Sequence, residues 1–274
     1  MANWLISGAA KGLGLHLSKA LLAQGHKVVG LIRNAEDCAM FQALAPGASF
    51  AVQFNVADTS GTAAAVQAAV DLAGPIDVLV NNAGYGYTGA IEEIPLAEMR
   101  ALFDVNLFGA IALIQAVLPA MRSRRAGLII NVSSVSGLAP WAGSAIYGAS
   151  KFAMECIGRT LRDEVKPLGI RVVNVAPGGM RTHFGGGSLK GAEPTIADYA
   201  TTAHLARPTL ANHQGEEPSD PVKVAKEIIA VSEQAEPPAL LLLGPDAYKY
   251  ATYHFAELAE QIDTWKSVTL STEA

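Results

Sequence analysis

Short apolar runs alternate with longer Ala- and Leu-rich stretches along most of this chain, and this alternation constrains the fold more than any other feature. The short runs have the length of buried strands, and the longer stretches carry apolar residues at helical spacing. Strands that alternate with helices form βαβ units, whose strands are parallel and covered on both faces. The sequence therefore predicts an α/β fold: a doubly wound, Rossmann-type sheet of seven parallel strands with helices on both faces.

Seven strands and seven helices are expected from this pattern. The strands are predicted at Trp4 to Ser7, Lys27 to Ile32, Ser49 to Phe54, Val78 to Val80, Gly127 to Val132, Arg171 to Val175 and Ala239 to Leu243. The helices are predicted to begin near Leu13, Ala35, Thr59, Pro95, Ser144, Pro221 and Asp246. With 274 residues, half of them hydrophobic, the chain can bury one large core, so residues 1–274 are predicted to form a single domain.

One region interrupts the alternation. Residues 178–221 contain Gly185-Gly186-Gly187, scattered Pro and His, and helical period only around Ile196 to Ala206. Long irregular segments inside compact domains are usually lids or binding loops, so this region is predicted to be a substrate-binding lid.

Charge and composition argue against several kinds of partner. A net charge of -5 and the lack of any Lys/Arg run disfavour nucleic acid or an anionic membrane surface. Cys38 and Cys156 are far apart and have no flanking His cluster, so reduced thiols and no metal site are predicted. Because the first strand follows Met1 almost directly, without a basic leader, a cytoplasmic protein is expected.

A glycine-rich segment, Ser7 to Gly14, joins the first strand to the first helix. A helix amino terminus attracts phosphate, and glycines allow backbone N–H groups to approach a pyrophosphate. The spacing GxxxGxG differs from the commoner GxGxxG, and a simple tight connection is the alternative. Its position after strand one favours a dinucleotide site.

Tyr147 and Lys151 lie four residues apart and so share one face of a predicted helix. A neighbouring cation favours the ionised form of a tyrosine, whose unperturbed pKa is about 10. The pair is therefore a candidate acid/base for proton exchange near neutral pH. A solvated helix face is the alternative.

These segments resemble, in order and spacing, those of the classical short-chain dehydrogenase/reductase family. The resemblance runs from residue 4 to about 184, and its similarity to the hydroxysteroid and retinol dehydrogenase type is a finer interpretation. The further motifs that carry it are Asn81-Asn82-Ala83-Gly84, Asn106, Ser133-Ser134, Pro177-Gly178 and Thr182. The resemblance implies hydride transfer between a nicotinamide cofactor and a secondary alcohol or ketone.

The resemblance also implies a role for each catalytic residue. Tyr147 would be the general acid/base, and Lys151 would favour its phenolate and bind the nicotinamide ribose. Ser134 would hydrogen-bond the substrate oxygen, and Asn106 would hold a water that links Lys151 to solvent. Ser150, between Tyr147 and Lys151, is expected to face away from them.

Cofactor contacts are implied in the same way. The implied set is Gly8, Lys11, Gly12, Leu13 and Gly14 for the phosphates, Asn55 and Val56 near the adenine, Asn82, Ala83 and Gly84 near the adenosine ribose, and Tyr147, Lys151, Pro177, Gly178 and Thr182 around the nicotinamide and its ribose. Asn55 stands where relatives usually carry Asp, but an amide oxygen can accept the same hydrogen bond.

Charge at the end of strand two favours NADP(H) over NAD(H). The strand ends in Arg33 and Asn34 with no acid to accept a ribose hydroxyl, and Arg33 and Lys11 are cations suited to a 2'-phosphate. The alternative is that Arg33 stacks on the adenine and Lys11 points to solvent.

The expected substrate is a small hydrophobic carbonyl or alcohol, because apolar residues dominate the predicted surroundings of Tyr147 and Ser134. Trp141 and Phe184 are the predicted substrate contacts, with further walls from the residues Tyr85, Tyr87 and Met180.

Other polar residues are expected to take no part in the chemistry. Glu92 and Glu93, just before a predicted helix, are expected to be solvated and favoured by the helix dipole. His183, His204 and His213 have no partner at ligand spacing and are expected to be loop-surface residues.

Three whole-protein hypotheses remain: the alcohol/ketone oxidoreductase, a nucleotide-binding redox sensor without turnover, and a reductase of a thioester-linked or quinone carbonyl. The intact set Asn106, Ser134, Tyr147 and Lys151 favours an enzyme. Apolar residues on more than one face of the helices from Pro95 and Ser144 predict a homodimer or homotetramer. The aromatic segment after Asp246 is expected to cover substrate or contact a partner subunit.

Overall fold

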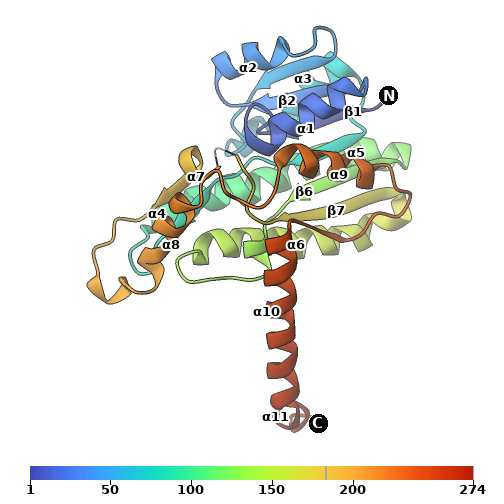
Figure 1. Ribbon diagram of the computed structural model, residues 1–274. Helices are drawn as coiled ribbons and strands as arrows, with labels where there is room; N and C mark the ends of the chain where they lie inside the picture. Colours follow the sequence, from blue (N-terminus) through green and yellow to red (C-terminus); the bar gives the residue numbers. More distant parts are fainter. Residues whose placement is uncertain (183, 274) are drawn as a thin grey trace.

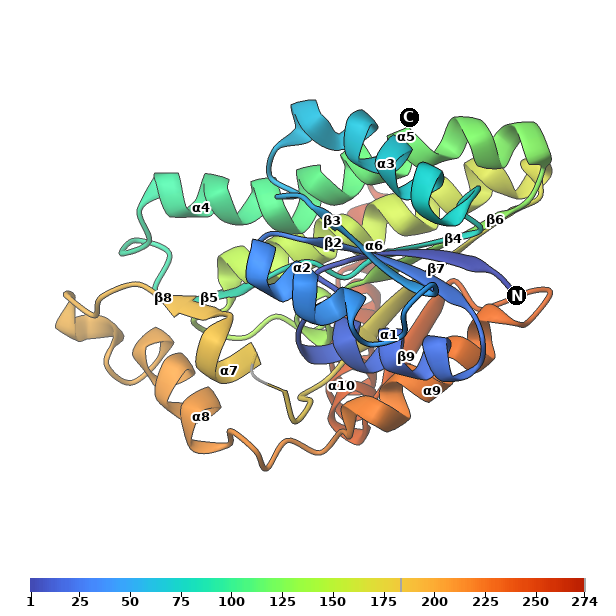
Figure 2. The ribbon, with the colours of Figure 1, turned by 90° about the horizontal axis from the view of Figure 1, so that it is seen from above.

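The computed structural model describes residues 1–182 and 184–273 and contains the predicted seven-stranded parallel sheet. Its strand order is β3-β2-β1-β4-β6-β7-β9 (Figures 1 and 2). Strands β1 to β3 are added toward one edge of the sheet and β4 to β9 toward the other, so the strand order reverses between β1 and β4. The strands are β1 (Asn3–Ser7), β2 (Lys27–Ile32), β3 (Ser49–Gln53), β4 (Val78–Asn81), β6 (Gly127–Val132), β7 (Ile170–Pro177) and β9 (Leu240–Leu243). Ligands of open parallel sheets bind at such a reversal, beyond the carboxyl ends of the strands.

Helices cover both faces of the sheet. The helices are α1 (Gly12–Ala23), α2 (Ala35–Gln42), α3 (Thr62–Ala73), α4 (Leu96–Phe103), α5 (Gly109–Arg124), α6 (Ala145–Val165), α7 (Phe184–Gly187), α8 (Ala206–Asn212), α9 (Pro221–Ser232), α10 (Pro245–Thr264) and α11 (Lys266–Leu270). Helices α1 and α9 pack on one face, and α3, α5 and α6 pack on the other. The helix predicted from Thr59 begins with a 3₁₀ turn and becomes α-helical only at Thr62.

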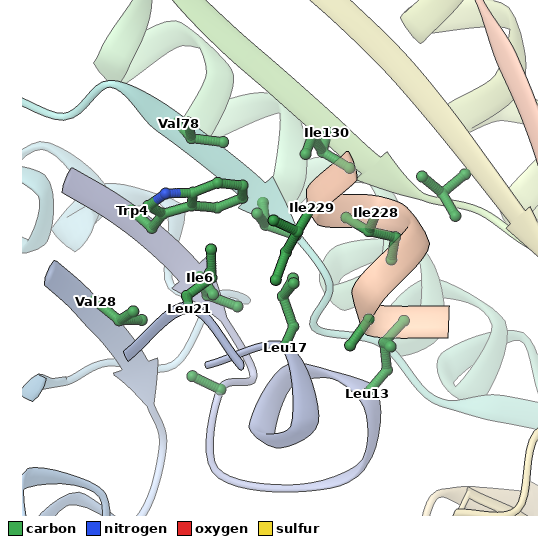
Figure 3. Packing of buried hydrophobic residues seen from close by; sticks show 14 of the residues in the cluster. Trp4, Ile6, Leu13, Leu17, Leu21, Val28, Val78, Ile130, Ile228 and Ile229 are labelled. Atoms are coloured by element: carbon green, nitrogen blue, oxygen red, sulfur yellow. The ribbon is translucent and has the colours of Figure 1, made fainter. Parts of the chain in front are cut away.

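The core lies in two layers because the strands present apolar side chains to both faces. In β1, Trp4 and Ile6 point to the α1/α9 side, where they pack with Leu17 and Ile229 (Figure 3). Leu5, between them, belongs to the layer under α3, α5 and α6. This alternation is the period of two expected of a strand, and burial of both faces explains the nearly continuous apolar runs in the sequence.

The helix predicted from Pro95 is divided by a π-helical turn, η2 (Asp104–Phe108). Together α4, η2 and α5 span Leu96–Arg124, which is long and apolar enough to cross a membrane by length and composition alone. Core helices of globular proteins pass the same test, and residues of α5 such as Leu113 and Val117 are buried against the sheet.

The predicted lid region contains α7, α8 and several shorter pieces. Its strand β8 (Leu189–Gly191) pairs in parallel with β5 (Gly86–Thr88), which follows β4. Two short 3₁₀ turns, η5 (Ala197–Tyr199) and η6 (Ala203–Leu205), occupy most of the stretch where one short helix is predicted. The β5–β8 pair places the lid beside the carboxyl end of the main sheet (Figure 2).

Helix α10 stands away from the body of the molecule, with the carboxyl terminus at its far end (Figure 1). Only its first two turns are anchored, through Ala247 and Ala251, which are buried. Ala251 packs with Leu138, in the loop that follows β6, and with Ala176 of β7.

Candidate active site

The glycine-rich turn after β1 has the backbone shape that only glycine adopts easily. Gly8 and Gly12 have positive φ angles of 67° and 51°. A Cβ on Gly14 would lie 2.4 Å from the carbonyl oxygen of Gly8, so a side chain there would displace the turn. The turn leads directly into the amino terminus of α1, as a pyrophosphate site requires.

Asn82 holds this turn in place from the end of β4. Its Nδ2 donates to the carbonyl oxygens of Ser7 and Gly8 at 2.9 and 3.1 Å. In return, the Ser7 hydroxyl accepts from the backbone N–H groups of Asn82 and Ala83, both at 3.0 Å. The two segments predicted to contact the cofactor therefore form one hydrogen-bonded unit.

The segment after β7 lies against the same unit. A Cβ on Gly12 would come within 3.9 Å of the Thr182 side chain, which places the predicted nicotinamide-binding turn beside the phosphate-binding turn. Asp246, at the start of α10, accepts a hydrogen bond from the Gly179 N–H at 2.7 Å. It also fills the space beside Gly178, where a Cβ would lie 2.1 Å from its Oδ1.

The adenine end contains a carboxylate that the sequence did not reveal. Lys11 pairs with Asp37, with 3.0 Å between Nζ and Oδ2, so Lys11 is not simply available to a phosphate. Arg33 is exposed at the tip of β2 and makes no ion pair with any described residue. The signal for Asp37 was its place in the first turn of α2, directly after that tip.

Asn55 and Val56, the residues predicted to lie near the adenine, follow the end of β3. The Asn55 Oδ1 accepts from the Ala57 N–H at 3.2 Å, which leaves its second lone pair for an adenine amino group. Val56 is buried, and a Cβ on Gly109 would lie 2.4 Å from its carbonyl oxygen.

The side chains of Asn106 and Lys151 both lie close to Gly84. A Cβ on Gly84 would lie 3.1 Å from the Asn106 Oδ1 and 3.4 Å from the Lys151 Nζ. Asn106 sits in the π-helical turn and exchanges two hydrogen bonds with the Tyr85 backbone, both at 3.0 Å. The buried Lys151 donates to the Val132 carbonyl at 2.9 Å. A π turn at such a residue is common at functional sites, because it redirects one side chain.

Ser150 faces Asn106, a contact that the sequence did not reveal. Its hydroxyl accepts from the Asn106 Nδ2 at 3.2 Å and donates to the Tyr147 carbonyl at 2.7 Å. Ser150 is fully buried. It therefore fixes the first turn of α6, which carries Tyr147, to the π turn that carries Asn106.

Tyr147 and Lys151 lie together, with the Lys151 Nζ 5.9 Å from the centre of the Tyr147 ring. Desolvation raises the pKa of Tyr147 to about 12, although the neighbouring Ser134 hydroxyl acts in the opposite direction. The expectation of a phenol poised near pH 7 is therefore wrong for the protein alone. Tyr147 keeps its proton at neutral pH, which suits it to donate that proton to a carbonyl oxygen.

Burial lowers the pKa of Lys151 to about 8, while the charge of Glu155, one turn further along α6, acts to raise it. Lys151 stays mostly protonated at pH 7 under this balance.

Glu155 ends a buried chain of amide hydrogen bonds that crosses the sheet. Asn81 donates to Asn131 at 2.9 Å, Asn131 donates to Asn174 at 3.0 Å, and Asn174 donates to the Glu155 Oε2 at 3.0 Å. A Cβ on Gly158 would lie 1.9 Å from the Asn174 Oδ1, so only glycine leaves room for this chain. The sequence showed Asn81 as a sheet residue but gave no sign of its partners.

One aromatic side chain lies next to Tyr147, and two others that were predicted to line the site have contacts of their own. The Phe184 ring of α7 lies 6.0 Å from the Tyr147 ring, centre to centre, and it also contacts Gly86, where a Cβ would lie 3.1 Å from its Cζ. The Trp141 Nε1 donates to Ser136 at 3.4 Å, two residues beyond Ser134. Tyr85 lies under the Lys190 ammonium, 5.2 Å from its ring centre.

Glu93 anchors the lid, and the expectation that it is solvated is wrong. Its side chain is 1% exposed, and it accepts hydrogen bonds from the N–H groups of Thr195 and Ile196, both at 2.7 Å. The His204 Nε2 lies 2.8 Å from its Oε2, so His204 is not a free surface histidine. We call these four residues the lid anchor. Glu92 accepts a separate hydrogen bond from the Tyr199 hydroxyl at 2.6 Å.

The hydrogen bonds of the lid anchor, together with the charge of His204, lower the pKa of Glu93 from 4.5 to about 2 against the opposing effect of desolvation. Because this pKa is depressed on folding, the stabilisation is complete above about pH 4.5 and is lost as the pH falls toward 2. Glu93→Gln should therefore loosen the lid at neutral pH. We expect amide hydrogen exchange at residues 195 and 196 to accelerate on the order of tenfold, measured by mass spectrometry.

Glu92→Gln is the matched control, because it removes a charge at the next position but leaves both backbone N–H bonds of the lid anchor intact. Equal exchange rates at residues 195 and 196 in the two variants would contradict the assignment.

No group of three His, Cys, Asp or Glu side chains in the described ranges 1–182 and 184–273 is arranged to hold a metal ion. His213 contacts the Thr209 carbonyl in an exposed part of the lid. His183 lies outside the described residues.

Known proteins share both the sequence and the fold. The family model described as short chain dehydrogenase matches residues 2–191. Oxidoreductase BOA17 of Botryotinia fuckeliana is 33% identical over 270 residues, which cover 98% of each chain. Retinol dehydrogenase 8 of Bos taurus is 36% identical over 251 residues, which cover 85% of this chain and 78% of the relative.

Two solved structures extend the comparison. The crystal structure of a short-chain dehydrogenase from Streptomyces avermitilis matches over 100% of both chains, with a TM-score of 0.93 and 35% identity. The closed form of serine dehydrogenase complexed with NADP+ matches over 89% of this chain and 94% of its own, with a TM-score of 0.74 and 25% identity.

The parallel sheet, the glycine cradle and the Tyr147–Lys151 pair define a nucleotide-binding oxidoreductase of the Rossmann type. The chain belongs to the short-chain dehydrogenase/reductase family.

Proposed function

We propose that this protein is an NADP(H)-dependent oxidoreductase that interconverts a secondary alcohol and a ketone. The observation that carries the proposal is the convergence of four side chains: Asn106 and Lys151 lie next to Gly84, Lys151 lies beside the Tyr147 ring, and Ser134 neighbours the Tyr147 hydroxyl. A protein that only sensed the nucleotide would have no physical need for a buried ammonium beside a protonated phenol.

The residues present fit a dinucleotide, since Gly8 and Gly12 have positive φ angles and a Cβ on Gly14 would collide with the Gly8 carbonyl, so this turn carries no side chains that would block a pyrophosphate. When bound, the nicotinamide supplies or accepts the hydride. Tyr147 donates its phenolic proton to the carbonyl oxygen during reduction and accepts the alcohol proton during oxidation. The Ser134 hydroxyl donates a hydrogen bond to the same oxygen as its negative charge develops.

Lys151 supplies a positive charge within 5.9 Å of the Tyr147 ring, which stabilises the phenolate left after proton donation. The Phe184 ring lies 6.0 Å from the Tyr147 ring and, with Trp141, supplies apolar surface for a substrate, which favours a small hydrophobic ketone or alcohol over a sugar.

The experiment that tests the proposal is NADPH oxidation by the purified protein over a carbonyl panel: aliphatic and aromatic ketones, a retinoid, a steroid ketone, a quinone, an acetoacetyl thioester and a polar ketose. We expect the hydrophobic ketones to give the highest kcat/KM. Higher efficiency with the ketose would refute the substrate class, and turnover confined to the thioester or the quinone would replace it. Binding of NADPH with no turnover on the whole panel would favour a sensor.

Cofactor preference depends on Arg33 in this proposal. NADP(H) is favoured because Arg33 is exposed at the tip of β2 and makes no ion pair with any described residue, although Asp37 lies next to that tip and offsets the charge of Lys11. Arg33→Asp should reduce the ratio of kcat/KM for NADPH over NADH by a factor on the order of 100, from loss of a charge-assisted contact and added repulsion.

Lys19→Asp is the control, since it makes the same charge change on the exposed side of α1, away from the tip of β2. A wild-type enzyme that uses both cofactors equally would disprove the preference.

We also propose a cytoplasmic location.

A further inference from the structure

The exposed part of α10 carries a coiled-coil repeat. From the first turn onward, apolar residues recur at alternating intervals of three and four. These residues, which we call the α10 seam, are Tyr248, Ala251, Phe255, Leu258, Ile262 and Trp265. A 3-4 alternation places side chains on one stripe of a helix and is the pattern by which two helices pack along their length.

The α10 seam is buried only at Ala251, near its start, and is exposed at its other positions. Ala251 is 1% exposed against Leu138, whereas Ile262 and Trp265 further along the same stripe are 72% and 64% exposed. No part of the described chain covers the outer seam, and α10 projects clear of the body (Figure 1). A helix of this length gains most of its stability from packing, so this stripe needs a partner.

The charged residues of α10 lie where they would not obstruct a second helix packed on the seam. The positions beside the outer seam include Thr252, Ala259 and Gln261, which are neutral. The acidic residues of the same helix lie on its other faces, namely Glu257, Glu260 and Asp263. Two such helices can therefore approach along their seams without bringing like charges together. The acidic polar face argues against an anionic membrane as the occupant, because helices that lie on membranes usually carry Lys and Arg there.

The area suits a stable association. The exposed parts of the five larger seam side chains amount to on the order of 500 Å² per chain, which with neighbouring atoms approaches the roughly 800 Å² per partner of a standard interface. A second copy of this chain offers an identical stripe, and two identical stripes pair about a two-fold axis.

We infer that the α10 seam is a self-association surface, on which α10 of one copy packs against α10 of a second copy. This contact is separate from the outer faces of α4, α5 and α6, where Phe108 and Phe152 are exposed. It does not depend on the proposed activity.

The test is sedimentation equilibrium of the full chain as wild type, Ile262→Glu and Tyr253→Glu. Tyr253 is the matched control, because it is also 72% exposed on α10 but lies off the seam. We expect Ile262→Glu to weaken self-association on the order of 100-fold or more, which halves the mass at micromolar concentration, because a carboxylate would enter an apolar contact. Tyr253→Glu should keep the wild-type mass.

Far-UV circular dichroism of all three proteins tests whether α10 and the body remain folded. A further variant, Leu258→Glu, repeats the mass measurement at the preceding seam position. A monomeric wild type, or equal masses for Ile262→Glu and Tyr253→Glu, would overturn the inference. Dissociation by Phe152→Glu but not by either seam variant would assign the interface to α6 instead. Binding of a monomeric wild type to phosphatidylcholine vesicles would assign the seam to a lipid surface and would equally overturn it.

Discussion

Tyr147→Phe should abolish most turnover, with kcat for ketone reduction falling by a factor on the order of 10² to 10⁴. The substitution keeps the ring, and with it the contact to Phe184 at 6.0 Å, but it deletes the proton that the carbonyl oxygen must receive. Because the pKa of Tyr147 is raised to about 12, the wild-type phenol is protonated throughout the neutral range and this proton is always available. Stopped-flow or steady-state NADPH oxidation measures the loss.

NADPH affinity should survive this change, since the glycine cradle is formed by other elements. Tyr85→Phe is the control: it removes a hydroxyl from a nearby ring that faces Lys190 and should leave most of the turnover. Parental turnover in Tyr147→Phe would mean that another group supplies the proton.

Gly14→Ala should weaken dinucleotide binding by a factor on the order of 10 to 100. The new methyl group would lie 2.4 Å from the Gly8 carbonyl oxygen and 2.7 Å from the Asn82 Nδ2, so it must push apart the turn and the amide that holds it. Such overpacking against backbone typically costs about 1–3 kcal/mol, and here the strain falls on the segment whose N–H groups face the pyrophosphate. Calorimetric titration with NADPH measures the effect.

Gly187→Ala is the control for this substitution, because a Cβ there meets nothing within 4 Å. If Gly14→Ala stays folded and binds NADPH as tightly as the wild type, the cofactor does not lie on this turn.

The sheet was predictable from the sequence because the central strands are buried on both faces, which produces short, nearly continuous apolar runs. All seven strands lie within two residues of the predicted bounds. Tyr147, Lys151, Ser134 and Asn106 were proposed from chain order and spacing, and their catalytic roles stay a prediction.

What the sequence could not show are contacts between residues distant in the chain. Glu93 was misjudged because its partners, Thr195, Ile196 and His204, follow about a hundred residues later. The contact between Ser150 and Asn106 could not be predicted because Asn106 lies in a π turn, whose rotation departs from regular helical spacing. The pKa of Tyr147 was misjudged because the sequence spacing reveals the nearby charge of Lys151 but not the burial that removes water from the phenol.

The β5–β8 pair has a consequence for how substrate enters. Because β8 belongs to the lid and β5 leads back to Asn106 through Tyr85, the lid cannot swing as a free flap about its two ends. For the lid to move outward, either the backbone pairing of Gly86 to Thr88 with β8 must break or β5 must move together with β8. Movement of β5 would disturb the hydrogen bonds between Asn106 and the Tyr85 backbone. If the segment acts as the proposed lid, its opening would displace Asn106, so entry of a ligand and the arrangement of the proposed proton-transfer residues would be coupled.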